Sequence, residues 1–189
     1  MKRFVSSIGA LALAGIASPA SADVVAASDA GFVSENEAVV QADSADVWAA
    51  LIQPQNWWNG VHSWSGDAAN FSLEPVAGGC FCEMLPDDGS VEHLRVVYAA
   101  PGALLRMSGA LGPLQSEAIT GTLTVQLEDA DDGATRIRWT YVAGGYSRIP
   151  LTAAAPAVDR VMAEQLDRLV ALLSTGDPES SPDENVGEM

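Results

Sequence analysis

A carboxylate and an imidazole are spaced to meet across a predicted β-hairpin. Two stretches of alternating residues flank the turn signal PDDGS at residues 86–90. If the hairpin closes around the middle of this turn, Glu83 lies opposite His93. Phe81 then lies opposite Arg95, and all four side chains share one face. A carboxylate beside an imidazole raises the pKa of the histidine and selects its tautomer. In a cavity, the pair could bind a polar group of a ligand or move a proton.

The same four residues could instead form a charge cluster on the solvent side of the sheet. The opposite face of the hairpin carries Leu94 and Val96 and is the more apolar of the two. An exposed cross-strand cluster would stabilise the fold by only tenths of a kcal/mol to about 1 kcal/mol. Both interpretations stay open at this level.

The second histidine, His62, lies in a predicted loop with the sequence NGVHSW, residues 59–64. Loops carry a disproportionate share of binding residues, so His62 is a candidate ligand contact. It could equally hold the loop together through local hydrogen bonds. Trp58 and Trp64 flank the loop and are candidates for the rim of a binding site.

The two cysteines, Cys80 and Cys82, are separated by one residue in a predicted strand. Alternate residues of a regular strand lie too far apart for an unstrained disulfide, so we predict two buried thiols. The two cysteines and two histidines match the number of ligands in a zinc site, but their spacing fits no zinc-binding pattern. We therefore expect no metal site.

The first 22 residues have the three-part pattern of a cleavable secretory signal peptide. Lys2 and Arg3 precede a mainly apolar run, residues 5–16, and small residues then lead to an expected cleavage site after Ala22. The apolar run is shorter than the roughly 20 residues that span a bilayer. We expect a periplasmic or secreted product that does not insert into the membrane after cleavage.

Removal of residues 1–22 would make the chain more acidic. The net charge would fall from −16 to −18, because Lys2 and Arg3 are two of the nine basic residues and all 25 acidic residues lie later in the chain. So acidic a surface repels phosphate backbones, and we expect no nucleic-acid partner. Lys2 is also the only lysine, which excludes a Schiff-base or P-loop lysine in the mature protein.

Sequence motifs for nucleophilic or nucleotide chemistry are missing from the chain. It contains no GxSxG elbow and no glycine-rich dinucleotide motif after a strand. We expect no cofactor, and the sequence singles out no catalytic nucleophile.

The elements that must position these candidates are mainly strands. One strand precedes two short helices, the second of which opens at Pro54 and holds Trp57 and Trp58. Six further strands and one long amphipathic helix follow. The predicted strands cover residues 31–42, 71–75, 79–85, 91–99, 103–108, 118–128 and 134–143, and the helices cover 45–52, the segment after Pro54, and 156–173.

This order of elements predicts the fold class. Strands and helices do not alternate, which excludes a parallel sheet, and one long helix is available to cover the buried face of an antiparallel sheet. We predict an α+β helix-grip fold, with about seven strands curved around the C-terminal helix and space between them for a small molecule. The predicted organisation is a signal peptide (1–22), a single domain (23–173) and a disordered acidic tail (174–189).

Three stretches give the chain a family resemblance. They are the ADVWAAL segment from Ala45 with the Trp57-Trp58 pair, the EPVAGGCFCE segment that ends at Glu83, and the terminal helix from Val158. The chain resembles the START-like, or SRPBCC, helix-grip superfamily, which includes polyketide cyclases, Bet v 1-type binders and activators of the Hsp90 ATPase. The segment GALGPLQ, ending at Gln115, looks like a motif of an exported branch whose role is poorly defined.

The resemblance implies a fold and only loosely a function, because one fold hosts carriers, cyclases and co-chaperones. The leading hypothesis is an exported protein that binds a small lipid-like or aromatic ligand. The second is an enzyme of cyclase or dehydratase type that uses a histidine–glutamate pair, and the third is a protein-interaction module. An ATP-free compartment would remove the Hsp90 chaperone as a partner. The candidate ligand-binding residues are Trp58, His62, Phe81, Glu83, His93, Arg95, Tyr98, Gln115 and Tyr141.

Overall fold

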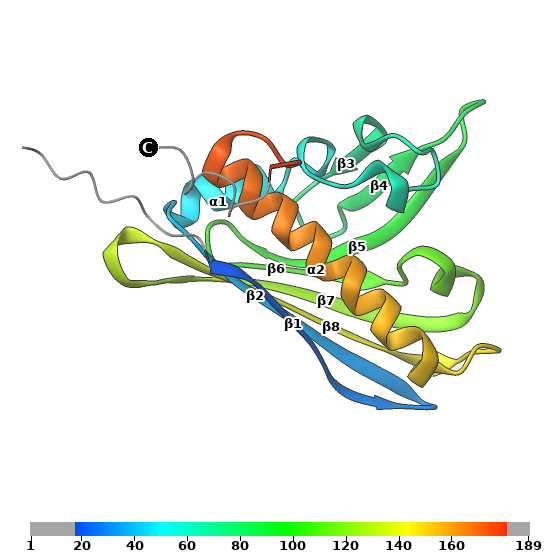
Figure 1. Ribbon diagram of the computed structural model, residues 1–189. Helices are drawn as coiled ribbons and strands as arrows, with labels where there is room; N and C mark the ends of the chain where they lie inside the picture. Colours follow the sequence, from blue (N-terminus) through cyan, green and yellow to red (C-terminus); the bar gives the residue numbers. More distant parts are fainter. Residues whose placement is uncertain (1–17, 181–189) are drawn as a thin grey trace, which may run out of the picture.

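The computed structural model describes residues 18–180 (Figure 1). Residues 1–17, which make up most of the predicted signal peptide, and residues 181–189 of the predicted tail lie outside the described part. Within it, neither α-helix is long and apolar enough to cross a membrane.

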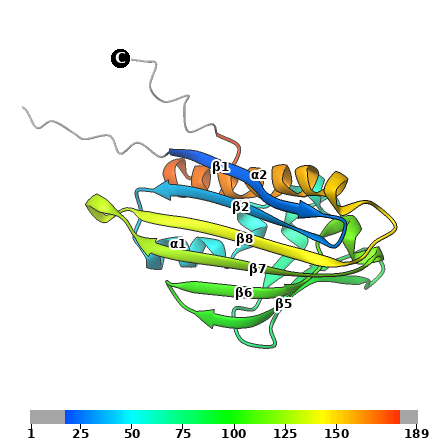
Figure 2. The ribbon, with the colours of Figure 1, turned by 90° about the horizontal axis from the view of Figure 1, so that it is seen from below.

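Eight strands form one antiparallel sheet in the order β1-β2-β8-β7-β6-β5-β4-β3. The sheet curves around the long helix α2, which lies along its concave side (Figures 1 and 2). The predicted α+β helix-grip fold is therefore confirmed. The strands are β1 (Ser18–Ser28), β2 (Gly31–Val40), β3 (Phe71–Leu73), β4 (Cys80–Met84), β5 (Ser90–Ala100), β6 (Leu104–Gly109), β7 (Ala118–Asp129) and β8 (Thr135–Tyr146).

Helical segments lie at all three places where the sequence predicts them, but the one that opens at Pro54 ends at Asn56, before Trp57 and Trp58. The helical elements are α1 (Ser44–Leu51), α2 (Leu151–Thr175) and the short 3-10 turns η1 (Pro54–Asn56), η2 (Gly60–His62), η3 (Ala68–Asn70), η4 (Gly112–Ser116) and η5 (Asp131–Gly133). Asp43 caps α1, since its Oδ1 accepts a hydrogen bond from the Asp46 N–H at 2.8 Å. The turns after β4 and β7 close hairpins as predicted.

Strand β1 is absent from the predicted strands. It pairs with β2 at the edge of the sheet, and its described side chains are mostly exposed. A strand with few buried side chains shows no clear alternation of apolar and polar residues, which is the signal that predicts strands. Cleavage after Ala22 would remove the first five residues of β1 and leave Asp23 opposite Glu35 of β2.

Helix α2 begins earlier than predicted. It starts at Leu151, and Pro156 lies inside it instead of opening it. Pro156 and Thr152 are both exposed, so water can replace the backbone hydrogen bond that the proline cannot donate. The helix ends at Thr175 with Gly176 in a left-handed conformation. The first two residues of the predicted tail therefore belong to the helix.

The inner face of α2 is not purely apolar. Asp159 carries a charged side chain but is buried against β2. Its Oδ1 accepts hydrogen bonds from Ser34 Oγ at 2.5 Å and from Asn36 Nδ2 at 3.4 Å. A carboxylate can be buried here because the two partner side chains replace the water it loses. This polar cluster ties the helix to the sheet.

The two cysteines form a disulfide, and the prediction of free buried thiols is wrong. Their Cα atoms are 5.3 Å apart, compared with roughly 6.6 Å for alternate residues of a regular strand. The two residues therefore lie closer together than the regular spacing on which the prediction relied. Both side chains are half-buried on the outer side of β4, opposite to Phe81 and Glu83.

Candidate functional site

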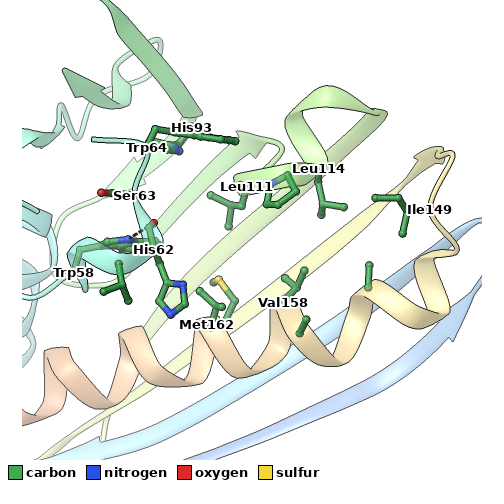
Figure 3. Close-up of a pocket in the computed structure, with 16 residues that line it drawn as sticks. Trp58, His62, Ser63, Trp64, His93, Leu111, Leu114, Ile149, Val158 and Met162 are labelled. Carbon is green, nitrogen blue, oxygen red and sulfur yellow. Dashed lines mark hydrogen bonds between the residues drawn. The ribbon is translucent and has the colours of Figure 1, made fainter. Parts of the chain in front are cut away.

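A cavity of about 480 Å³ lies between the first half of α2, the loop after η1 and the segment around η4 (Figure 3). Its walls are almost entirely apolar, and its polar side chains are His62, Ser63 and His93. The exposed side chains of Val61, Trp64 and Ile149 belong to the same wall. The lining residues are Trp58, Val61, His62, Ser63, Trp64, His93, Leu111, Gly112, Pro113, Leu114, Ile149, Ala154, Ala157, Val158, Val161 and Met162.

A β-bulge turns His93 toward this cavity. In the β4–β5 register, Phe81 pairs with Leu94 and Cys82 pairs with Glu92, so His93 is an extra residue on β5. As a result, His93 and Leu94 are consecutive in sequence but both buried. A regular strand would have sent one of them outward.

Glu83 holds His93 in place from β4. Glu83 is fully buried, and its Oε2 lies 2.9 Å from His93 Nε2. The predicted contact is therefore present, although the hairpin pairs Glu83 with Val91 instead of His93. The two side chains meet diagonally across the strands and not directly opposite each other.

The Glu83 carboxylate also fastens the loop that borders the cavity. Its Oε2 accepts a hydrogen bond from the Trp64 N–H at 3.1 Å, and its Oε1 accepts one from the Ser65 N–H. Burial by itself would raise the pKa of Glu83, but the hydrogen bonds from Ser65, Trp64 and His93 together lower it. Glu83 is thus a buried carboxylate that remains ionised.

His93 is packed among aromatic rings. Its ring centroid lies 5.1 Å from that of Phe71 and 5.3 Å from that of Phe81. Burial lowers the pKa of His93, and the neighbouring Glu83 only partly offsets this effect. At neutral pH the imidazole is uncharged.

His62 occupies the opposite side of the cavity, where the loop meets α2. Its Nε2 lies 3.0 Å from Glu164 Oε2, and Asn59 Nδ2 donates a hydrogen bond to the same carboxylate. The Asn59 N–H donates to Gln165 Oε1 at 2.7 Å. The two interpretations of His62 therefore meet in one side chain, which lines the cavity and also holds the loop on the helix.

Two other candidates support the cavity from behind. Phe81 is buried against Phe71 and His93. Tyr141 is buried, and its hydroxyl oxygen accepts a hydrogen bond from the N–H of Leu111, a lining residue, at 3.4 Å. Burial raises the pKa of Tyr141 to about 12. Neither residue belongs to the cavity lining.

Three predicted residues lie away from the cavity. Arg95 points outward, where its guanidinium hydrogen-bonds to Glu92 and to the Gly78 carbonyl. Tyr98 is 51% exposed, because a second register shift in β5, at Val97, directs it to the outer face. The amide of Gln115 donates to the backbone carbonyl of Glu92 at 3.0 Å. The predicted common face for Phe81, Glu83, His93 and Arg95 thus holds only for the first three.

Part of the lining comes from residues that the sequence does not single out. Leu111 and Leu114 come from the η4 segment, and Val158 and Met162 come from α2. The last two lie on the apolar face of the amphipathic C-terminal helix. No local sequence pattern predicts that these residues line a cavity, because the cavity depends on the position of the neighbouring loop.

The histidines and cysteines do not form a common metal site. Within residues 18–180, three potential ligands that lie close enough to share a metal ion are Cys80, Cys82 and Glu92, and this group contains no histidine. Its two sulfur atoms are bonded to each other. A thiolate is the metal-binding form of cysteine, so this group does not suit a metal ion in its oxidised state.

Comparisons with known proteins agree with this architecture. The family model described as polyketide cyclase/dehydrase and lipid transport matches residues 32–174. The chain belongs to this family. The matched range includes nearly all of every element from β2 to α2 and leaves out β1. Among curated proteins, none matches the chain significantly.

Solved structures share the fold at low sequence identity. A conserved protein of unknown function from Enterococcus faecalis has a TM-score of 0.57 and 13% identity, over 87% of this chain and 81% of that protein. A protein from Mesorhizobium loti has a TM-score of 0.54 and 18% identity, over 77% and 98%. A protein from Rhodobacter sphaeroides has a TM-score of 0.52 and 20% identity, over 83% and 100%. At these identities the likeness concerns the fold.

Proposed function

We propose that this family member is an exported binding protein for a small, mainly apolar molecule, held in the cavity between the sheet and α2. The observation that carries the proposal is the cavity of about 480 Å³, whose walls are apolar and whose polar side chains are few. Ligand sites commonly combine an apolar wall with a small number of polar groups that orient the ligand. The lipid transport in the family description fits this use.

Binding of a neutral fluorescent probe, N-phenyl-1-naphthylamine, tests the proposal. The probe should gain fluorescence with the wild-type protein, and Val158→Trp, which fills the cavity from α2, should weaken its binding about tenfold or more. Val142→Trp is the matched control, because Val142 is 49% exposed on the outer side of β8. Absence of probe binding, or equal effects of the two variants, would refute a ligand-binding cavity.

Export is the second half of the proposal. It is supported by the signal-peptide pattern in the first 22 residues. The mass of the protein recovered from the periplasm or medium should correspond to a chain that begins at Asp23. Recovery of the uncleaved chain from the cytoplasm alone would contradict export and leave the binding proposal standing.

A second function, cyclase or dehydratase chemistry, is favoured by one specific observation. His93 lines the cavity and contacts a buried carboxylate, which would orient the imidazole as a general base and which a carrier does not need. A simple 1,3-diketone such as 2-acetylcyclohexanone provides the test, through solvent deuterium incorporation at its acidic carbon. His93→Gln should abolish any protein-dependent exchange and leave probe affinity nearly unchanged. Exchange no faster than in buffer argues for binding alone.

A further inference from the structure

The protonation of the Glu83–His93 pair determines what His93 offers to a ligand. Glu83 Oε2 accepts from the Trp64 N–H, and Oε1 accepts from the Ser65 N–H. Both carboxylate oxygens therefore face N–H donors, and the lowered pKa of Glu83 agrees with an ionised group. An ionised carboxylate only accepts hydrogen bonds, so the proton between Glu83 and His93 resides on Nε2 of the imidazole.

The other ring nitrogen of His93 is consequently a hydrogen-bond acceptor. A neutral imidazole with its proton on Nε2 carries a lone pair on Nδ1. In the part of the chain that the structure describes, Nδ1 has no hydrogen-bond partner. Some side-chain nitrogen and oxygen atoms of the described residues are fully buried without a hydrogen-bond partner, for example in Asn36 and Gln165, but Nδ1 of His93 is not one of them. Nδ1 is therefore accessible, and the cavity is the space that His93 borders.

The rest of the cavity wall offers no partner to a charged group. The lining contains no arginine, lysine, aspartate or glutamate. Glu83 is occupied by three donors, and Glu164 by His62 and Asn59. A carboxylate or phosphate would thus be desolvated without a counter-charge, and it would approach a protein of net charge −16.

We propose that the ligand is a neutral molecule with a hydrogen-bond-donating hydroxyl group at its buried end, and that Nδ1 of His93 accepts this hydrogen bond. The inference rests on the binding function proposed above and adds the polar chemistry of the site. Figure 3 shows His93 across the cavity from α2, so an apolar body could extend from it along Leu111, Val158 and Met162. Phe71 and Phe81 fix the orientation of the acceptor by packing on the imidazole.

Three naphthalene derivatives of similar size test the inference. Affinities of 2-naphthol, 2-methoxynaphthalene and 2-naphthoate are measured by displacement of N-phenyl-1-naphthylamine at about pH 7.5, where the naphthol is neutral and the naphthoate is ionised. A buried hydrogen bond to a hydroxyl predicts that the naphthol binds about tenfold tighter than its methyl ether. The naphthoate should bind more weakly than either.

Two variants assign the effect to His93. His93→Phe retains an aromatic ring but lacks the acceptor, so the naphthol should lose its advantage while the affinity of the methyl ether stays within about twofold. Tyr98→Phe is the control away from the cavity, because Tyr98 is exposed on the outer face of β5, and it should keep the preference for the naphthol. If His93→Phe fails to fold, the ¹⁵N chemical shifts of the wild-type imidazoles decide the tautomer. A His93 protonated on Nδ1 instead of Nε2 would overturn the inference.

The outcomes separate this inference from the function on which it rests. Equal binding of naphthol and methyl ether, or tightest binding of naphthoate, would overturn the neutral hydroxyl ligand and leave a binding protein. Failure of the probe and all three compounds to bind would overturn both.

Discussion

At the scale of single residues, the centre of this protein is a buried carboxylate that performs two tasks. Glu83 orients the imidazole of His93 and receives the backbone N–H groups of Trp64 and Ser65. One side chain thereby links β4, β5 and the loop that closes the cavity. The charge of Glu83 can be buried because hydrogen bonds from these donors replace the water that the carboxylate loses.

Glu83→Gln should destabilise the protein strongly. An amide is nearly isosteric with the carboxylate but presents an NH₂ group to neighbours that are themselves donors, so at least one donor loses its acceptor. We expect the free energy of unfolding to fall by about 2–3 kcal/mol in urea denaturation. Glu92→Gln on the exposed side of the same hairpin should cost less than about 1 kcal/mol. Equal losses would contradict the role assigned to Glu83.

The buried histidine should make stability depend on pH. Burial lowers the pKa of His93 in the folded state below its ordinary value of 6.5, so the unfolded chain binds the proton more readily. The neutral imidazole of His93 contributes to the free energy of unfolding above about pH 6.5, and this contribution is lost as the pH falls toward the folded-state pKa. His93→Gln should flatten the fall in the free energy of unfolding between about pH 7 and pH 5. A fall of the same size in His93→Gln would assign the pH dependence to another group.

At the scale of elements, α2 is positioned by a polar contact as well as by its apolar face. Asp159 lies among Leu151, Ala155 and Met162 on the buried side, where it meets Ser34 and Asn36 of β2. Apolar packing permits a helix to slide along a sheet, whereas hydrogen bonds require specific partners. The cluster therefore sets the position of the helix that forms one wall of the cavity.

Removal of the Asp159 carboxylate should weaken this contact. Asp159→Ala leaves the Ser34 hydroxyl and the Asn36 amide buried with fewer partners, and we expect a loss of about 2–4 kcal/mol in the free energy of unfolding. Arg160→Ala, at the adjacent exposed position, should change it by less than about 0.5 kcal/mol. In a double-mutant cycle, Ser34→Ala and Asp159→Ala should be strongly non-additive, and additive effects would refute direct coupling.

At the scale of the whole molecule, the dominant feature is its negative charge. The sequence carries a net charge of −16, and the described ion pairs include few of its acidic residues, such as Glu37 with Arg136 and Arg138. The remaining carboxylates repel one another across the surface. Such repulsion keeps a protein soluble but destabilises its compact state.

Salt should therefore stabilise this protein. Raising NaCl from about 10 mM to about 300 mM shortens the screening length to well below the size of the domain. We expect the Tm to rise by about 3 °C or more, the equivalent of roughly 1 kcal/mol for a domain of this length. Calorimetry measures this directly, and a Tm that stays constant or falls would show that the charges are spaced too widely to interact.

Much of the fold was predictable because its signals are local. The turn at residues 86–90, the alternation in β7 and β8, and the helical repeat of α2 each occur within a short window of sequence. Strand β1 and the first turn of α2 were not predictable in this way. The exposed side chains of β1 carry no periodic signal, and Pro156 mimics a helix start.

The sequence by itself determined the acidic composition, the order of the elements from β2 to α2, the helix-grip class and a contact between Glu83 and His93. The direction in which that pair points was decided only in the tertiary structure. An unpaired residue in β5 turns His93 inward beside Leu94, while Arg95 and Tyr98 turn outward. A bulge is a property of the hydrogen bonds between two strands, so neither strand encodes it alone. The disulfide likewise became evident only in the structure, where the Cα atoms of Cys80 and Cys82 lie closer together than in a regular strand.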